Sequence, residues 1–349
     1  MVELQKLVSF YRNKRILITG VGGTVGKALL TRFLSIGPKG IVGVDRNEEG
    51  TFNLVESEVG HAPNVIINTG DTLDLNHLMR LMEGVDVIFH TAAYKHVLLG
   101  EMSPRPLIDT NIRGLQNVID ASISMGVKYT IFTSSDKAVN PTNVMGTSKL
   151  LGERLVTAAN VQAYNSNVLF ASVRFGNLIG SSGSVLPTWL HLLETGRPLT
   201  LTDERMTRFF MTISEAVDLI LQVPLLACGG EVFVTKMPVF RIKDLLDAVI
   251  NEWRDQKNLK SFSPEVIITG ARPGEKFQEE LLTEEEVRRT WETDHFFIVR
   301  PAFIAAKHIT YGYPDLDVSP AHRVYTSGSQ PTLSVEAIRE YLRFNGLIA

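Results

Sequence analysis

The sequence has little cysteine: Cys228 stands alone among 349 residues. One thiol cannot form a disulfide within the chain, and it rules out a zinc site built from several cysteines. We expect no metal site, and a protein kept in a reducing compartment. Runs of about 18 apolar residues, which a membrane-spanning helix needs, are also missing. Residues 1–15 carry Glu3 and lack an apolar core, unlike a secretory signal peptide. A cytoplasmic protein without membrane insertion is therefore expected.

The sequence also has no large excess of charge of either sign. The 35 Lys and Arg residues nearly balance the 38 Asp and Glu residues, which leaves a net charge of -3. Such a balance gives no general reason to bind nucleic acid or anionic lipid. Because 44% of the residues are hydrophobic and 21% are charged, the chain can bury a large core. We expect one large α/β domain and a smaller second one.

Short β-branched runs alternate with helical segments in the first half of the chain. Continuous apolar runs separated by helices are typical of a parallel sheet covered on both faces. We therefore expect a Rossmann-type, doubly wound sheet. The predicted strands are residues 15–19, 40–44, 65–67, 85–89, 130–133 and 168–173, and the clearest predicted helices are residues 25–34, 111–124 and 144–159.

The alternation of strands and helices breaks after Arg174. Residues 176–184 read as a loop and residues 200–208 as polar and irregular, whereas residues 231–234 are expected to return to the main sheet. A helix (242–253) and a strand (266–268) follow, which suggests a smaller C-terminal α/β domain. The expected division assigns residues 1–178 and 213–237 to the Rossmann domain, and residues 179–212 and 238–349 to the second domain.

A glycine-rich turn follows the first predicted strand. Three glycines recur at three-residue spacing in residues 19–26 (TGVGGTVG). Glycine lets the backbone approach a pyrophosphate, whose charge then meets the N-terminus of the next helix. Glycine turns also close strands for structural reasons, but here the strand, the helix and an acid at the end of the next strand agree. We predict a dinucleotide site that contains Gly20, Gly23, Thr24, Val25 and Gly26.

Two charged residues at the end of the second predicted strand bear on the choice of cofactor. Asp45 is placed to accept hydrogen bonds from the adenosine ribose, which favours NAD. Arg46 could instead hold the 2′-phosphate of NADP, and Asp45 could merely cap the next segment. NAD is the expected cofactor, with NADP as the alternative. Further cofactor contacts are expected at Asp71, Thr72, Ala92, Ala93, Tyr94 and Asn111.

Residues 134–149 (SSDKAVNPTNVMGTSK) lie at the end of the fifth predicted strand. Ligands of open α/β sheets bind beyond the carboxyl ends of the strands. Here the chain resembles the extended short-chain dehydrogenases/reductases, and closely the UDP-N-acetylglucosamine 4,6-dehydratases of polysaccharide biosynthesis. The resemblance covers residues 13–285 and is to the short form that lacks N-terminal membrane helices. Its other motifs are TGVGGTVG, AAYKHV, VRFGNLIGSSGSV, MTRFFMTI and ARPGEKFQEELL.

The resemblance implies a redox-neutral dehydration. Hydride leaves C4 of the sugar, the C5 proton and the C6 hydroxyl are lost, and hydride returns to C6. Such chemistry needs an adjacent acid and base: by similarity, Asp136 protonates the leaving hydroxyl and Lys137 exchanges the C5 proton. A lysine base must be neutral, so burial or a nearby cation, for which Lys149 is the candidate, must lower its pKa. A solvated ion pair is the ordinary alternative for adjacent Asp and Lys.

Lys149 matches the lysine of the family's Tyr-x-x-x-Lys pattern, which implies that it holds the nicotinamide ribose. The tyrosine position is Met145, which cannot accept a proton. Either the chain is a cofactor-binding regulator without activity, or another group takes the C4 hydroxyl proton. Met-x-x-x-Lys beside Asp-Lys occurs in the dehydratase family, which favours the second reading, with Asp136 and Ser135 as candidates.

The two phosphates of a UDP-sugar call for arginines and backbone donors. By the resemblance, arginines and an asparagine contact the diphosphate and uridine, a glutamate lies near the nucleoside ribose, and the second domain binds the nucleotide sugar. Each arginine could instead form a structural salt bridge. Ser182 could bring a backbone donor to a phosphate or simply form part of a turn. The expected substrate residues are Lys95, His96, Arg174, Asn177, Ser182, Arg208, Arg272 and Glu275.

The leading hypothesis is an NAD(P)-dependent UDP-N-acetylglucosamine 4,6-dehydratase of surface-glycan biosynthesis, a lyase. A nucleotide-sugar 4-epimerase is the alternative, but it needs no acid at C6, so Asp136 and Lys137 favour dehydration. A silent NAD(P)-binding regulator is supported by Met145 alone. AAYKHV, Met145 and Asp45 resemble the branch that retains the C5 configuration, so retention is expected. The apolar stripe on helix 111–124 fits core packing or a dimer interface, and a homo-oligomer is expected.

Overall fold

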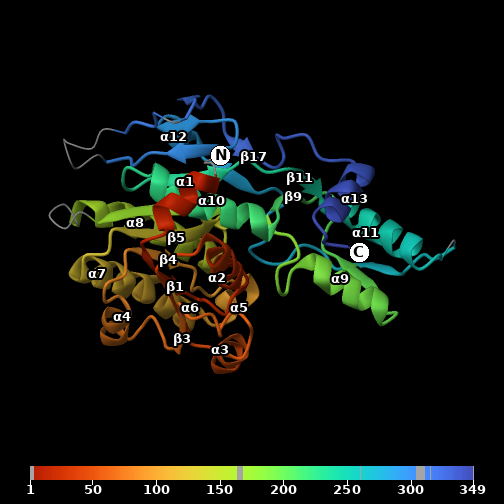
Figure 1. Cartoon of the computed structure of the whole chain (residues 1–349). Coiled ribbons are helices and arrows are strands. Elements are labelled where there is room, and N and C mark those ends of the chain that lie inside the picture. Colours follow the sequence, from red (N-terminus) through yellow and green to blue (C-terminus); the bar gives the residue numbers. More distant parts are fainter. Residues whose placement is uncertain (1–3, 163–167, 260, 304–310, 315, 349) are drawn as a thin grey trace. The chain divides into compact units, whose positions relative to one another are not determined.

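The structure is a computed structural model that describes residues 4–162, 168–259, 261–303, 311–314 and 316–348. The chain divides into two compact units (Figure 1). None of the helices in the described ranges is both long and apolar enough to cross a membrane. Unit 1 comprises Met1–Phe175, Val217–Lys236 and Thr283–Arg323, and unit 2 comprises Gly176–Ala216, Met237–Leu282 and Val324–Ala349.

Unit 1 is built on one large sheet, which has ten strands within the described residues, in the order β16-β14-β15-β10-β6-β5-β4-β1-β2-β3. The strands from β10 to β3 are parallel, and β15, β14 and β16 extend the sheet in antiparallel pairing. The order 3-2-1-4-5-6 is that of a doubly wound dinucleotide-binding fold, so the predicted fold class is confirmed. The strands are β1 (Arg15–Thr19), β2 (Gly40–Asp45), β3 (Val65–Thr69), β4 (Val87–His90), β5 (Tyr129–Ser135), β6 (Leu169–Phe175), β10 (Val232–Thr235), β14 (Thr290–Glu292), β15 (Phe296–Val299) and β16 (Ser319–Pro320).

Helices cover both faces of this sheet. On one face, Leu17 and Ile88 pack with residues of α4 and α7. The neighbouring Phe89 points to the other face, because side chains alternate along a strand, and its ring lies 5.4 Å from Phe33 of α2. Figure 1 draws α4 and α7 on one side of the strands and α2 on the other. The helices are α1 (Leu4–Tyr11), α2 (Thr24–Ile36), α3 (Glu48–Val55), α4 (Leu75–Leu81), α5 (Val97–Met102), α6 (Pro104–Ile108), the π-helix η1 (Asp109–Gly114), α7 (Leu115–Met125), the 3₁₀-helix η2 (Asp136–Ala138), α8 (Val144–Gln162), α10 (Ile213–Leu226) and α12 (Glu284–Val287).

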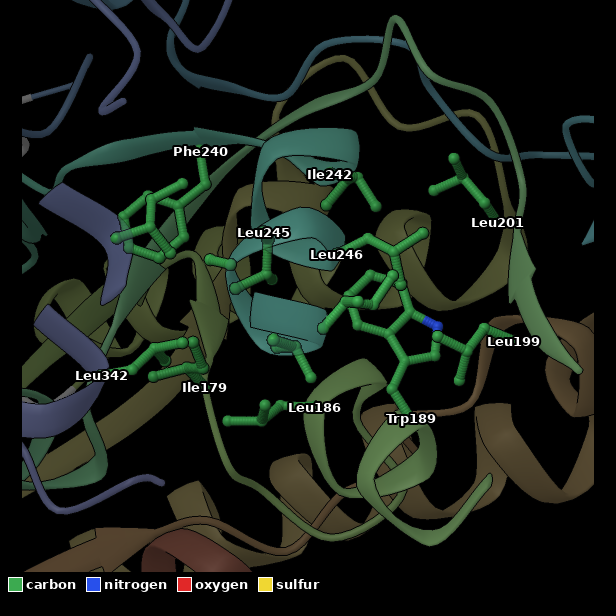
Figure 2. Close-up of a cluster of buried hydrophobic side chains, with 14 of the residues drawn as sticks. Ile179, Leu186, Trp189, Leu199, Leu201, Phe240, Ile242, Leu245, Leu246 and Leu342 are labelled. Carbon is green, nitrogen blue, oxygen red and sulfur yellow. The ribbon is translucent and has the colours of Figure 1, made fainter. Parts of the chain in front are cut away.

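Unit 2 has its own apolar core. Trp189 is 1% exposed, and its indole N–H donates to the Thr200 carbonyl at 2.8 Å. Figure 2 shows Trp189 among leucines and Phe240 that come from several elements. Its elements are β7 (Asn177–Leu178), α9 (Val185–Glu194), β8 (Leu199–Leu201), β9 (Thr207–Met211), β11 (Val239–Arg241), α11 (Ile242–Gln256), β12 (Val266–Ile268), β13 (Glu280–Leu282), β17 (Tyr325–Thr326) and α13 (Val335–Phe344).

Two features differ from the sequence-based expectation, and one agrees with it. Residues 283–323 belong to unit 1, not to the second unit, because β15 pairs with β10 and extends the main sheet. Residues 200–208 were expected to be irregular; residues 202–206 lie outside the strands, but β8 ends at Leu201 and the fully buried β9 begins at Thr207. The expected return of residues 231–234 is confirmed, since β10 pairs in parallel with β6.

Candidate active site

The glycine turn between β1 and α2 packs so closely against neighbouring backbone that two of its positions admit no side chain. A Cβ on Gly26 would lie 2.2 Å from the Gly20 carbonyl oxygen, and a Cβ on Gly20 would lie 2.6 Å from the Ala92 nitrogen. Gly20 also has a φ of 73°, which favours glycine. Gly23 caps α2 without a side-chain hydrogen bond, so the first amides of the helix face the turn. This geometry fits a bound pyrophosphate.

A cavity of about 120 Å³ adjoins this turn in unit 1. It lies at the carboxyl ends of the strands, where β1 and β4 are neighbours although β2 and β3 intervene in the sequence. The structure therefore gathers eight of the predicted cofactor residues around one cavity. These are Gly20, Gly23, Asp45, Arg46, Asp71, Thr72, Ala92 and Ala93.

Asp45 and Arg46 are both held in place at the rim. The Asp45 carboxylate accepts hydrogen bonds from the Gly22 nitrogen at 2.9 Å and the Asn47 nitrogen at 3.0 Å. Asp45 therefore caps the following turn and also faces the glycine loop. The Arg46 guanidinium stacks 4.3 Å from the centre of the Tyr94 ring and donates to Thr110 at 3.1 Å.

Asn111 connects the loop after β4 to α8. Its Oδ1 accepts from the Tyr94 nitrogen at 2.8 Å, and its Nδ2 donates to the Tyr94 carbonyl at 3.1 Å and to Ser148 Oγ at 2.9 Å. The residue is 3% exposed and lies in the π-helix η1, an element that is frequent at functional sites. The structure thus places Asn111 as a brace between two expected cofactor-binding segments.

Asp136 and Lys137 form a short turn at the end of β5. Asp136 is fully buried, and its Oδ1 accepts from Ser135 Oγ at 2.6 Å, the Lys137 nitrogen at 2.9 Å and Lys137 Nζ at 3.0 Å. Its Oδ2 is also buried, yet it has no hydrogen-bond partner among the described residues. A buried polar atom of this kind needs an explanation. The pair is therefore not an ordinary solvated ion pair, and Oδ2 is the oxygen left to carry a proton.

Lys149 lies behind this turn, 7% exposed. Its Nζ donates to the Thr133 carbonyl at 2.8 Å and lies 4.8 Å from the centre of the Phe132 ring. Burial lowers the pKa of Lys149 to about 8, against the opposing charge of Glu153. Met145, one turn earlier on α8, is 3% exposed, so an apolar side chain stands where the related pattern has tyrosine.

His90 was missed by the sequence analysis. It ends β4, fully buried, with Nδ1 2.7 Å from Thr19 Oγ1 and with Nε2 unpartnered among the described residues. Burial and the charge of Lys149 lower the pKa of His90 to about 3, so the ring is neutral. A histidine within an apolar strand gives no signal of its own, because only the fold brings it near Lys149.

The structure does not support the predicted role of Arg174. It was expected to contact the substrate diphosphate, but it is fully buried within unit 1. Its Nη2 lies 2.6 Å from Glu153 Oε2 and 2.8 Å from Glu286 Oε1. Two carboxylates therefore occupy this guanidinium, and the salt-bridge alternative describes it.

Four of the other expected substrate residues share a cavity of about 390 Å³ in unit 2: Asn177, Arg208, Arg272 and Glu275. Arg208 is 7% exposed in its side chain and lies 3.4 Å from Glu275 and 3.6 Å from Glu279. Glu275 also accepts from the Arg272 nitrogen at 3.2 Å, so the three residues form one charged group at the cavity.

The N-terminus of α9 lines the same cavity, next to the predicted Ser182. Ser184, at the helix N-cap, borders the cavity, whereas Ser182 does not. Ser184 Oγ is buried without a partner in the described structure, and it makes no capping hydrogen bond to α9. Such a helix start is suited to binding an anion. In unit 1, Lys95 and His96 are exposed in the loop before α5. The described ranges contain no group of His, Cys, Asp and Glu suited to hold a metal ion.

Comparison with known proteins agrees with this geometry. The family described as "Polysaccharide biosynthesis protein" matches residues 16–301. The chain belongs to this family. It is 44% identical over 297 residues to "Uncharacterized membrane protein MJ1061" of Methanocaldococcus jannaschii, covering 85% of this chain and 89% of that protein. It is 36% identical to a UDP-N-acetylglucosamine 4,6-dehydratase (inverting) of Campylobacter jejuni, covering 84% of each. It is 32% identical to a UDP-glucose 4-epimerase of Rickettsia conorii, covering 95% of each.

Solved structures share the fold. Pen from Bacillus thuringiensis has a TM-score of 0.87 at 36% identity, with 96% of this chain and 98% of that chain covered. The dTDP-glucose 4,6-dehydratase DesIV from Streptomyces venezuelae has a TM-score of 0.67 at 21% identity, with 75% of this chain and 86% of that chain covered. The extended short-chain dehydrogenase/reductase architecture is therefore common to these proteins.

Proposed function

We propose that this protein is an NAD(P)-dependent UDP-N-acetylglucosamine 4,6-dehydratase. The observation that carries the proposal is the buried Asp136, whose Oδ1 is saturated by donors while Oδ2 is free, directly beside Lys137. An acid and a base held side by side are what elimination of water requires. Membership of the polysaccharide biosynthesis family and the relative named a UDP-N-acetylglucosamine 4,6-dehydratase support it.

The unit 1 cavity is the proposed site of NAD. Glycine at positions 20 and 26 allows the close backbone packing that shapes this turn, and Asp45 presents a carboxylate fixed by two backbone amides. A fixed carboxylate there accepts hydrogen bonds from ribose hydroxyls but repels a 2′-phosphate. When bound, the nicotinamide supplies a reversible hydride acceptor. The order of preference is therefore NAD over NADP.

The chain's own groups move the protons. Asp136 Oδ2 holds the proton that the departing C6 hydroxyl takes, since Oδ1 is already occupied. Lys137 removes the C5 proton, a step that requires its amine to be neutral. Lys149 is the nearby cation in this scheme, anchored on the Thr133 carbonyl. The C4 hydroxyl proton passes to Asp136, with Ser135 as relay at 2.6 Å.

The unit 2 cavity is proposed to bind the UDP portion of the substrate. Arg208 and Arg272 supply positive charge, and the start of α9 supplies backbone amides with Ser184. Guanidinium groups and helix N-termini are both suited to phosphate oxygens. The expected role of Glu275 at the nucleoside ribose remains part of the proposal.

A nucleotide-sugar 4-epimerase is the second candidate, because one relative carries that name. An epimerase has no use for an acid at C6, whereas Asp136 keeps a free buried oxygen beside Lys137. The two activities differ by one water in the mass of the product.

We further propose that the C5 configuration is retained. Lys137 lies directly beside Asp136, with its Nζ 3.0 Å from Oδ1, and a base that removes and returns a proton on one face preserves the configuration. The apolar Met145 at the tyrosine position agrees with the branch that retains. The relative named an inverting dehydratase makes inversion the competing outcome, which the product's stereochemistry decides.

The test is incubation of purified protein and NAD with UDP-N-acetylglucosamine in heavy water. Loss of one water, with one deuterium at C5 of a product of retained configuration, is expected. Unchanged mass with an altered C4 configuration would show an epimerase, and inverted C5 would refute retention alone. Lys137→Ala should abolish dehydration and exchange while NAD binding stays within a few-fold. Lys128→Ala is the matched control. Lys128 lies outside the catalytic motif, and its Nζ pairs with Asp86 Oδ1 at a distance of 2.9 Å. This variant should keep full activity.

A further inference from the structure

The first turn of α8 packs directly against the catalytic turn, which is formed by Asp136 and Lys137. Gly146, directly after Met145, is buried. A Cβ on Gly146 would lie 2.2 Å from the Lys137 carbonyl oxygen and 3.1 Å from its carbonyl carbon. Real Cβ atoms do not come so close to backbone, and this backbone belongs to the residue proposed as the base. Only glycine allows the helix and the turn to touch here.

The intervening chain is shaped to produce this contact. The Val139 nitrogen donates to the Asp136 carbonyl at 3.0 Å and closes η2. Asn140 then adopts a φ of 43°, a left-handed conformation that asparagine tolerates better than most residues. Asn143 accepts from the Gly146 nitrogen through its Oδ1 at 2.8 Å and caps α8. The chain thus reverses within residues 139–143 and returns Gly146 to the Lys137 carbonyl.

We propose that Gly146 is a positioning residue for Lys137: the absence of its side chain lets α8 act as a backstop that fixes the Lys137 backbone, and with it Nζ, beside Asp136. The role rests on the proposed dehydratase function. Lys137 Nζ lies 3.0 Å from Asp136 Oδ1, and an added methyl group at residue 146 must displace the Lys137 carbonyl by about 1 Å. A misplacement of about 1 Å can lower a catalytic rate by about 10²-fold.

The variant Gly146→Ala tests the proposal. We expect kcat for dehydration and the rate of C5 deuterium exchange to fall about 10²-fold together, while KM for UDP-N-acetylglucosamine and the affinity for NAD stay within a few-fold. A merely structural defect would not separate kcat from KM in this way.

Gly60→Ala is the matched steric control. A Cβ there would lie 2.4 Å from the carbonyl oxygens of Leu54 and Val55, at the end of α3, so it strains the same unit with no contact to the catalytic turn. We expect Gly60→Ala to lower the melting temperature comparably while kcat stays unchanged. A folded Gly146→Ala protein with kcat like that of Gly60→Ala would overturn the proposal.

A milder pair of variants serves if Gly146→Ala does not fold. Asn143→Ala removes the acceptor that fastens the Gly146 nitrogen, and Asn143→Ser restores one. The first should lower kcat with KM unchanged, and the second should recover most of the activity. Equal kcat in the two variants would count against positioning through α8.

A second measurement separates this proposal from the proposed function. The rate at which acetic anhydride acetylates Lys137, followed by peptide mass spectrometry, reports the placement of its amine without any substrate. Gly146→Ala should change this rate several-fold relative to wild type, and Gly60→Ala should not. If the wild-type protein dehydrates no UDP-sugar, the proposed function fails while the labelling rates still decide on Gly146. Equal labelling in all three proteins would refute positioning.

Discussion

Replacement of Arg174 by methionine should strongly destabilise unit 1. The folded variant should keep the KM of the wild type for the UDP-sugar. In the native protein, Arg174 Nη2 lies 2.6 Å from Glu153 and 2.8 Å from Glu286, and all three side chains are nearly inaccessible to solvent. Methionine has a similar length but no charge. The variant would leave two carboxylates buried beside one another without a cation.

The magnitude follows from the burial and from the acidity of Glu286. Burial alone raises its pKa, but the charge of Arg174 and the hydrogen bonds outweigh that and lower the pKa to about 2, from 4.5. A difference of this size corresponds to about 3 kcal/mol of stabilisation at neutral pH. Breaking a buried ion pair by removing one partner costs about 3–5 kcal/mol. We expect Arg174→Met to lower the free energy of unfolding by a similar amount at pH 7.

The sign of the pH dependence should reverse in the variant. A carboxylate whose folded pKa is depressed stabilises the protein above its unfolded pKa of 4.5, and that stabilisation is lost as the pH falls toward about 2. Without Arg174, the buried carboxylates bind protons more readily in the folded state. Arg174→Met should therefore become more stable as the pH falls from 7 to 5, where the wild type does not.

Urea unfolding at several pH values measures these effects, and steady-state kinetics measure KM. The neutral control replaces all three charges, with Glu153→Gln and Glu286→Gln added to Arg174→Met, and should recover much of the lost stability. Stability within about 1 kcal/mol of wild type, combined with a strongly raised KM for the UDP-sugar, would refute the reasoning and return Arg174 to the substrate.

Three further predictions concern other parts of the chain. Because the pKa of Lys149 is lowered to about 8 from 10.5, its charge opposes folding below pH 8; Lys149→Met should raise the free energy of unfolding at pH 7 by up to about 3 kcal/mol. That gain should shrink as the pH rises from 8 to 10.5 in urea titrations, and a gain independent of pH would contradict it. Asp45→Ala should narrow the preference for NAD over NADP measured by titration, and tighter NADP binding by the wild type would show that Arg46 dominates. Trp189→Ala should lower the free energy of unfolding of unit 2 by about 3–5 kcal/mol, because Trp189 lies in its apolar core (Figure 2). Urea unfolding measures this loss, and a loss below about 1 kcal/mol would refute the place of Trp189 in the core.

The elements that depend on local sequence could be predicted. The predicted bounds of strands β1, β2, β5 and β6 lie within two residues of the observed ones. They could be predicted because a strand buried on both faces needs an unbroken apolar run. The glycine turn was equally clear, since its spacing follows from one strand, one turn and one helix. The pairing of β15 with β10 joins segments about sixty residues apart, and no local pattern announces it.

The site shows the same division. Asp136, Lys137 and Lys149 could be proposed from one continuous motif, because neighbours in sequence stay neighbours in a turn and a helix. The fate of Arg174 could not, since Glu286 is 112 positions away and only folding brings the two together. His90 and Gly146 are likewise unremarkable in sequence. Only the fold places His90 near a buried lysine and Gly146 against the Lys137 carbonyl. The sequence by itself determined the class of fold and the chemical groups at hand. The tertiary structure decided which groups are buried, paired or left free, because burial and pairing depend on contacts between distant segments.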